Sequence, residues 1–124
     1  MSHWTTIKTN IKDIDALRDA CKELGLDLLP NAQARGYGAT TTRGDFVIRL
    51  RGPYDIAVHK EHDGTYRLST DWWEGHVEQE VGKDYGRLLQ LYGVHKATRE
   101  ARKKGLRVQR ASLQNNVIKL TLTS

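Results

Sequence analysis

Apolar residues in the first part of the chain recur every three to four positions, which is the spacing of one helix face. The stripe consists of Ile14, Leu17, Cys21 and Leu24. Asp13 can cap the N-terminus of such a helix, and Gly25 can end it. The pattern therefore predicts a helix over residues 13–24. Because Cys21 lies on the apolar stripe, we interpret it as a small core residue rather than a nucleophile.

The middle of the chain alternates between apolar and polar positions, and this period of two is typical of half-buried strands. The inward positions are Phe46, Ile48, Leu50, Ile56, Val58, Tyr66, Leu68, Thr70 and Trp72. Asp63-Gly64 is a hairpin turn signal between the last two strands. We expect one more short strand around residues 26–29, followed by a glycine-containing segment of turns or ordered loop up to residue 44.

A second helical pattern runs from about residue 83 to residue 104, and the glycine at 105 ends it. Its apolar side is formed by Tyr85, Leu88, Leu89 and Tyr92. Gly93 lies inside the pattern and costs about 1 kcal/mol relative to alanine, so a kink or a break is possible there. Residues 106–114 and 118–122 are typical of a terminal hairpin, because asparagine tolerates the positive φ that its turn at residues 115–116 requires.

The order of elements is strand, helix, four strands, helix, two strands. This order predicts a single α+β domain over residues 1–124, with an antiparallel sheet of about five to seven strands and two helices packed on one face. The 124 residues are 38% hydrophobic and 28% charged, with one cysteine and no apolar run of the roughly 20 residues that span a bilayer. We expect a cytoplasmic protein with no membrane association, no secretory signal and no cofactor.

Positive charge is concentrated near the end of the second helix. Residues 96–110 hold seven basic residues and one acid, so this window carries +6 although the whole chain carries only +5. The basic patch consists of Lys96, Arg99, Arg102, Lys103, Lys104, Arg107 and Arg110. Cations at a helix C-terminus offset the helix dipole, which explains part of the patch without any partner. Arg107 and Arg110 lie beyond the helix, however, so binding of nucleic acid or another anionic surface stays open.

Three further groups of residues are candidates for chemistry or binding. Trp72 is expected inside and Trp73 at least partly exposed, because adjacent strand residues face opposite sides, and exposed tryptophan is favoured at binding hot spots. His59, His62 and His76 are candidate metal ligands, although two strand residues three apart project to opposite faces. Gly36-Tyr37-Gly38 lacks the other residues of a phosphate-binding loop, so turn geometry is the better interpretation.

The opening segment MSHWTTIKT resembles the N-terminus of a family of uncharacterised proteins found in cyanobacteria, some algal plastid genomes and other bacteria. The segment 66–73 and the helix 88–105 with its terminal hairpin are also similar to that family. This chain has Trp4 where phenylalanine is expected, and Gly93 where alanine is usual. The family has no established activity, so the resemblance does not suggest one. Some members are thought to lie beside an ATPase of the AAA type, and the resemblance therefore implies such an ATPase as a partner.

From these features we expect a small non-enzymatic protein-interaction or accessory module. Its candidate partner-binding residues are His3, Trp4 and Trp73, of which the first two belong to the N-terminal motif. The alternative is a nucleic-acid-binding accessory protein that uses the basic patch. A third hypothesis is a metal-binding protein or enzyme that uses the three histidines.

Overall fold

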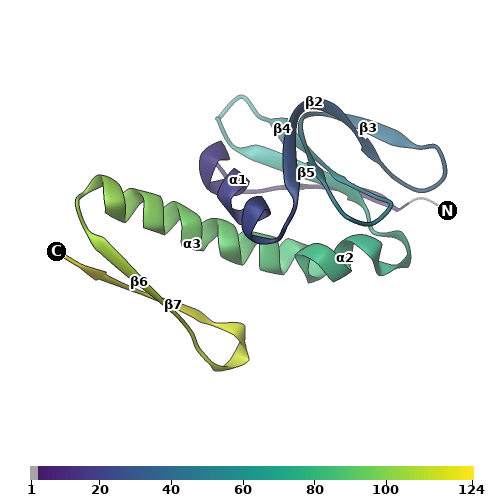
Figure 1. Ribbon diagram of the computed structural model, residues 1–124. Coiled ribbons are helices and arrows are strands. Elements are labelled where there is room, and N and C mark those ends of the chain that lie inside the picture. The colour runs from purple at the N-terminus through teal and green to yellow at the C-terminus, as the bar shows by residue number, and fades with distance from the viewer. Residues whose placement is uncertain (1–2) are drawn as a thin grey trace.

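The computed structural model describes residues 3–124, so Met1 and Ser2 of the N-terminal motif lie outside the described residues. The chain is an α+β protein, as predicted (Figure 1). Its strands are β1 (Trp4–Lys8), β2 (Asp27–Arg35), β3 (Thr41–Arg49), β4 (Ile56–Lys60), β5 (Tyr66–Asp71), β6 (Arg107–Ser112) and β7 (Ile118–Thr123). Its helices are α1 (Ile14–Glu23), α2 (His76–Val81) and α3 (Gly86–Lys103). Short 3-10 turns cover residues 73–75, 83–85 and 114–116.

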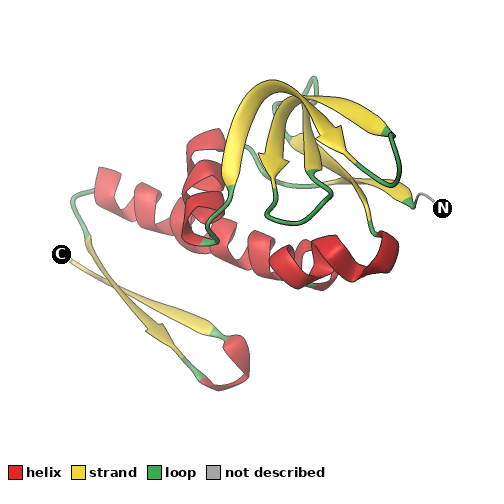
Figure 2. Ribbon diagram, turned by 45° about the vertical axis from the view of Figure 1, so that its right-hand side comes forward, coloured by secondary structure: helices red, strands yellow, loops and turns green. Residues whose placement is uncertain are grey.

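The first five strands form one antiparallel sheet in the order β1-β5-β4-β3-β2. The helices α1 and α3 lie on the same side of this sheet (Figure 2) and pack against each other. Alternate strand residues, including Ile48, Ile56 and Leu68, are fully buried against them. The predicted packing of two helices on one face is confirmed. The predicted sheet of about five to seven strands has five, because β6 and β7 pair only with each other.

Local chemistry explains why α1 begins where the sequence predicted. The Asp13 side chain accepts hydrogen bonds from the backbone N–H groups of Asp15 and Ala16, so two of the helix's otherwise unpaired donors are satisfied. Cys21 is fully buried in the core, and this burial raises its pKa to about 12. Its interpretation as a core residue is therefore confirmed, since a thiol with that pKa is protonated at neutral pH.

The other face of the sheet is covered by part of the sheet itself. The strands β2 and β3 form a long hairpin that bends over this face (Figure 2). A small second cluster of Ala34, Val47 and Ala57 fills the inside of this bend. Trp4 packs against the cluster, and its indole N–H donates to Thr40 Oγ1 at 3.2 Å. A Cβ at Gly36 would lie 2.5 Å from the Trp4 ring, so only glycine permits this approach.

Three sequence expectations about element length were wrong. The strand expected over residues 26–29 extends from 27 to 35, and β3 begins at residue 41. The sequence pattern predicted no helix between Trp73 and Gly82, but this segment contains α2. The second helix begins at Gly86 rather than residue 83, because Asp84 and Tyr85 adopt positive φ angles of 52° and 63°.

The C-terminal hairpin of β6 and β7 lies on the far side of α3 from the main sheet (Figure 1). It is tied back at its tip, where the Gln90 side chain donates to the carbonyl of Asn116, and Ile118 packs against the core. Leu113, Val117 and Leu122 remain about half exposed. The helix between sheet and hairpin runs through Gly93 without a break.

Candidate functional site

Some residues of the basic patch form ion pairs that the sequence did not predict, and within the described residues the others form none. Arg99 Nε lies 2.6 Å from Asp19 Oδ2 on α1, and Arg110 donates to both carboxylate oxygens of Glu23 at 2.9 and 2.7 Å. Lys96 Nζ lies 3.5 Å from Glu100 Oε1, one turn along its own helix. Three of the seven patch residues therefore have an acidic partner. The Arg99 and Arg110 pairs join α1 to α3 and to β6, whereas the Lys96 pair lies within α3.

Four patch residues have no acid within ion-pair distance among residues 3–124: Arg102, Lys103, Lys104 and Arg107. They lie at the end of α3 and the start of β6, and all are exposed. Lys22, near the end of α1, is also exposed and has no acidic partner in the described chain. The cations of the basic patch that lack an acidic partner in this part of the chain are thus grouped at the end of α3 and the start of β6, and Lys22 adds one more on α1.

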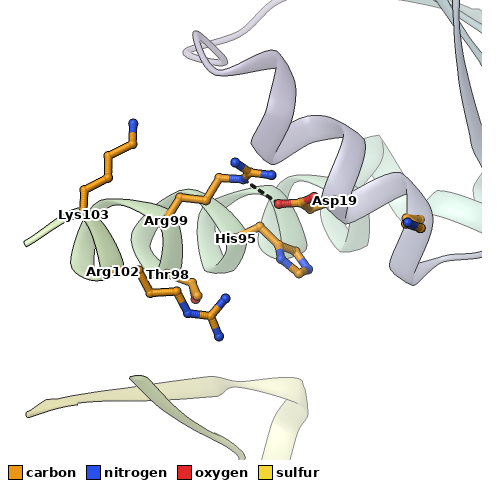
Figure 3. Close-up of a pocket in the computed structure, with 7 residues that line it drawn as sticks. Asp19, His95, Thr98, Arg99, Arg102 and Lys103 are labelled. Atoms are coloured by element: carbon orange, nitrogen blue, oxygen red, sulfur yellow. Dashed lines mark hydrogen bonds and ion pairs between the residues drawn. The ribbon is translucent and has the colours of Figure 1, made fainter. Parts of the chain in front are cut away.

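An open groove of about 690 Å³ lies between α1 and α3 (Figure 3). It is lined by Asp19, Lys22, His95, Thr98, Arg99, Arg102 and Lys103. The five α3 residues are spaced three or four apart or adjacent, so they share one side of the helix. Figure 3 shows Arg99 reaching across to Asp19, while Arg102 points toward the terminal hairpin. We call this feature the basic groove.

Glu23, one turn along α1 from Asp19, lies outside the groove lining and joins α1 to the hairpin. Besides its two bonds to Arg110, it lies 2.7 Å from His95 Nε2. The hydrogen bonds from Arg110, followed by that from His95, outweigh partial burial and lower the pKa of Glu23 to about 2. The pKa of Asp19 is lowered as well, mainly by its hydrogen bond from Arg99. Both acids stay charged at neutral pH; Asp19 joins the two helices that form the groove, and Glu23 joins α1 to the hairpin.

A second cluster of functional candidates lies at the N-terminal end of the sheet. The rings of His3 and Trp73 are stacked, with centroids 5.0 Å apart and planes 12° apart. Tyr37, from the loop after β2, meets Trp73 edge-on with centroids 5.7 Å apart. His3 and Tyr37 are exposed and Trp73 is half-buried. We call these three residues the aromatic surface.

The buried carboxylate of Asp71 holds the aromatic surface together. It accepts hydrogen bonds from the backbone N–H groups of His3 (2.9 Å), Tyr37 (2.9 Å) and Trp73 (3.0 Å). Burial alone would raise the pKa of Asp71, but these donors and the nearby His3 side chain lower it further than burial raises it. One charged side chain therefore fixes three chain segments that are distant in sequence.

The two neighbouring tryptophans both pack against the main core, which the sequence analysis did not expect. Strand geometry ends at Asp71, and Glu74 then adopts a positive φ of 61° in a tight 3-10 turn. Because Trp72 has already left strand geometry (φ −85°, ψ 9°), the alternation of faces no longer applies to Trp73, and both indoles reach the core. Trp72 packs edge-on against Tyr85 and donates to Thr5 Oγ1 at 3.0 Å, while Trp73 stays partly exposed as predicted.

The three candidate metal ligands are not brought together. His59 lies on β4, His62 lies in the following turn, and His76 begins α2 at the other end of β4, where it packs edge-on against Tyr54. In the described part of the chain, no group of three or more His, Cys, Asp or Glu residues is arranged to hold a metal ion. Gly36-Tyr37-Gly38 forms a turn closed by the bond from the Gly36 N–H to the Thr40 carbonyl.

Sequence reasoning missed the acids and the tyrosine that define both sites. Asp19 and Glu23 were visible as polar positions four apart on the first helix, which gave a clue that they share one face. Asp71 and Tyr37 gave no such clue, because their roles depend on the pairing of β1 with β5 and on the curl of β2. Trp4, proposed together with His3, instead packs the first strand onto the sheet.

Comparison with known proteins places the chain in a family. The family model described as protein of unknown function (DUF1257) matches residues 20–121. The chain belongs to this family. It is also similar to the uncharacterized protein ycf35 of Pyropia yezoensis, with 31% identity over 97% of this chain and 94% of that protein. The ycf35 protein of Guillardia theta is 28% identical over 98% of this chain and 96% of its own length.

These matches confirm the resemblance seen in the sequence and supply no activity for the DUF1257 chain. No solved structure matches it. Within residues 3–124, no helix combines the length and apolar character needed to cross a membrane. The function of this DUF1257 protein is therefore inferred from its two surface sites.

Proposed function

We propose that this DUF1257 protein is a small non-enzymatic accessory module that binds a partner protein through the aromatic surface. The observation that carries this proposal is the assembly of His3, Tyr37 and Trp73 from three separate segments around one buried carboxylate. Tyrosine and tryptophan are enriched at binding hot spots because they offer large contact area at low entropic cost.

Preorganisation supports the same interpretation. The loops that carry the three rings are held by backbone bonds to Asp71, so little conformational freedom is lost when a partner covers them. Tyr37 is 42% exposed although it lies next to a half-buried tryptophan. A partner could therefore bury substantial apolar area without reshaping the fold. The family resemblance names an AAA-type ATPase as the first partner class to test.

The test begins with capture of the partner. A photo-crosslinking amino acid in place of Tyr37 is expected to trap a specific protein in extracts of the source organism. The purified partner is then titrated calorimetrically against wild type, Trp73→Ala and Tyr37→Ser. Loss of a hot spot is worth about 2 kcal/mol or more, so we expect Kd to rise about 30-fold or more for Trp73→Ala.

Two controls separate binding from folding. Leu122→Ser changes an exposed apolar residue on the hairpin, far from the aromatic surface, and should leave Kd unchanged. Tyr37→Ser changes an exposed ring, so its unfolding transition should stay near that of wild type. If Kd is the same for wild type, Trp73→Ala and Tyr37→Ser, or if the crosslinker traps no specific protein, the proposal is wrong.

A further inference from the structure

The basic groove is not used by the proposed function, and its charge is unbalanced. Its lining holds four cations, Lys22, Arg99, Arg102 and Lys103, against the single acid Asp19. That acid is already engaged by Arg99 Nε at 2.6 Å. The other three cations have no acidic partner among residues 3–124. Such a groove attracts an anion that can contact several cations at once.

The elements that carry these cations are held together by two ion pairs. The Asp19–Arg99 pair joins α1 to α3, and the Glu23–Arg110 pair joins α1 to β6. The two groove walls therefore cannot separate without breaking charged hydrogen bonds. Lys104 and Arg107 continue the positive charge past the end of α3, so the free cations extend beyond the groove itself.

From this geometry we infer that the basic groove binds the phosphodiester backbone of duplex nucleic acid without reading its sequence. All seven lining residues carry charged or polar groups, and none is an apolar aliphatic or aromatic residue that could form a pocket for the anchoring side chain of an acidic protein segment. The lining also contains no tryptophan, tyrosine or phenylalanine on which unpaired bases could stack, as single-strand binders require. Phosphate contacts alone suit a duplex, whose bases are stacked on each other.

The experiment measures fluorescence anisotropy of labelled 20-base-pair DNA and RNA duplexes at 50 and 200 mM salt. A single strand of the same length and a labelled polyglutamate peptide serve as competing ligand classes. Three to five phosphate contacts predict that affinity falls roughly 40- to 500-fold between the two salt concentrations. We expect both duplexes to bind, each with a Kd that stays the same when its base sequence is scrambled.

Charge variants locate the site. Lys22→Glu combined with Arg102→Glu should weaken duplex binding at 50 mM salt by at least roughly tenfold. The matched control, Arg43→Glu combined with Lys60→Glu, makes the same change in net charge on strands away from the groove, and it should have a much smaller effect. Asp19→Asn removes the groove's negative charge and should tighten binding roughly threefold.

Three results would overturn the inference: no duplex binding at 50 mM salt, tighter binding of the single strand or of polyglutamate than of the duplexes, or equal losses in the two charge-reversed pairs. The inference stands apart from the proposed partner protein, because Tyr37→Ser should leave duplex affinity unchanged. Circular dichroism of each variant confirms that it is folded before it is titrated.

Discussion

Replacing Asp71 with alanine is expected to destabilise the protein and to loosen the aromatic surface. The change removes one buried carboxylate and leaves the N–H groups of His3, Tyr37 and Trp73 without their acceptor. A buried donor that loses its partner costs about 1–3 kcal/mol. His3 and Tyr37 can regain water because they are exposed, so we expect a total loss of about 3 kcal/mol. For a chain of this length, that loss lowers Tm by about 10 °C.

Urea unfolding at pH 7 measures this loss directly, followed both by far-ultraviolet circular dichroism and by tryptophan fluorescence. Fluorescence should also change in the folded state, since Trp73 adjoins the altered site. Asp27→Ala is the control, because Asp27 is exposed and its side chain makes no hydrogen bond or ion pair within the described chain. A loss below about 1 kcal/mol, or one equal to that of the control, would refute the proposed role of the carboxylate.

The pH dependence provides a second check of the same carboxylate. Burial raises the pKa of Asp71, but the N–H donors of Tyr37, His3 and Trp73 lower it more, so its folded value lies below its ordinary one. Its contribution to stability is therefore complete above the unfolded pKa of about 3.9 and is lost as the pH falls through the folded pKa. Below pH 5 the stability of wild type should fall more steeply than that of Asp71→Ala. Parallel curves would contradict this assignment.

Two other substitutions test the core and the hairpin. The buried Tyr85 hydroxyl has no hydrogen-bond partner in the described chain. Tyr85→Phe should therefore leave the free energy of unfolding, measured by urea titration, unchanged or raise it by up to about 1 kcal/mol. A clear loss of stability would show that the hydroxyl has a partner. Glu23→Gln weakens the contacts with Arg110 and His95. In a hydrogen-exchange measurement, the backbone amides of β6 and β7 should therefore exchange about fivefold faster, while those of the main sheet keep their rates. Equal acceleration in both sheets would contradict a local role for Glu23.

Local patterns predicted most of the fold. The α1 helix followed from its apolar stripe and from Asp13, whose capping bonds lie within three residues. The strands from β3 to β5 followed from alternation. The helix α2 was missed because the turn before it depends on positive φ angles at Glu74 and Gly75, and the backbone preference of a single glutamate does not predict such a turn.

The two sites were predicted only in part, because each depends on contacts between distant residues. Counting charges found the basic patch, but the acids that neutralise Arg99 and Arg110 lie about 80 positions earlier in the chain. His3 and Trp73 were each proposed as binding residues on separate grounds. Their stacking required the register that pairs Trp4 with Asp71, and no local pattern specifies that register.

The pairing of β1 with β5 also sets the order of events when the chain is made. The N-terminal strand emerges first from the ribosome, yet its partner Tyr66–Asp71 is synthesised about 60 residues later. Until then, His3 has neither the stacked indole nor the carboxylate beside it. The aromatic surface is therefore absent from a nascent or unfolded chain. A protein that binds this surface would distinguish finished molecules from incomplete ones.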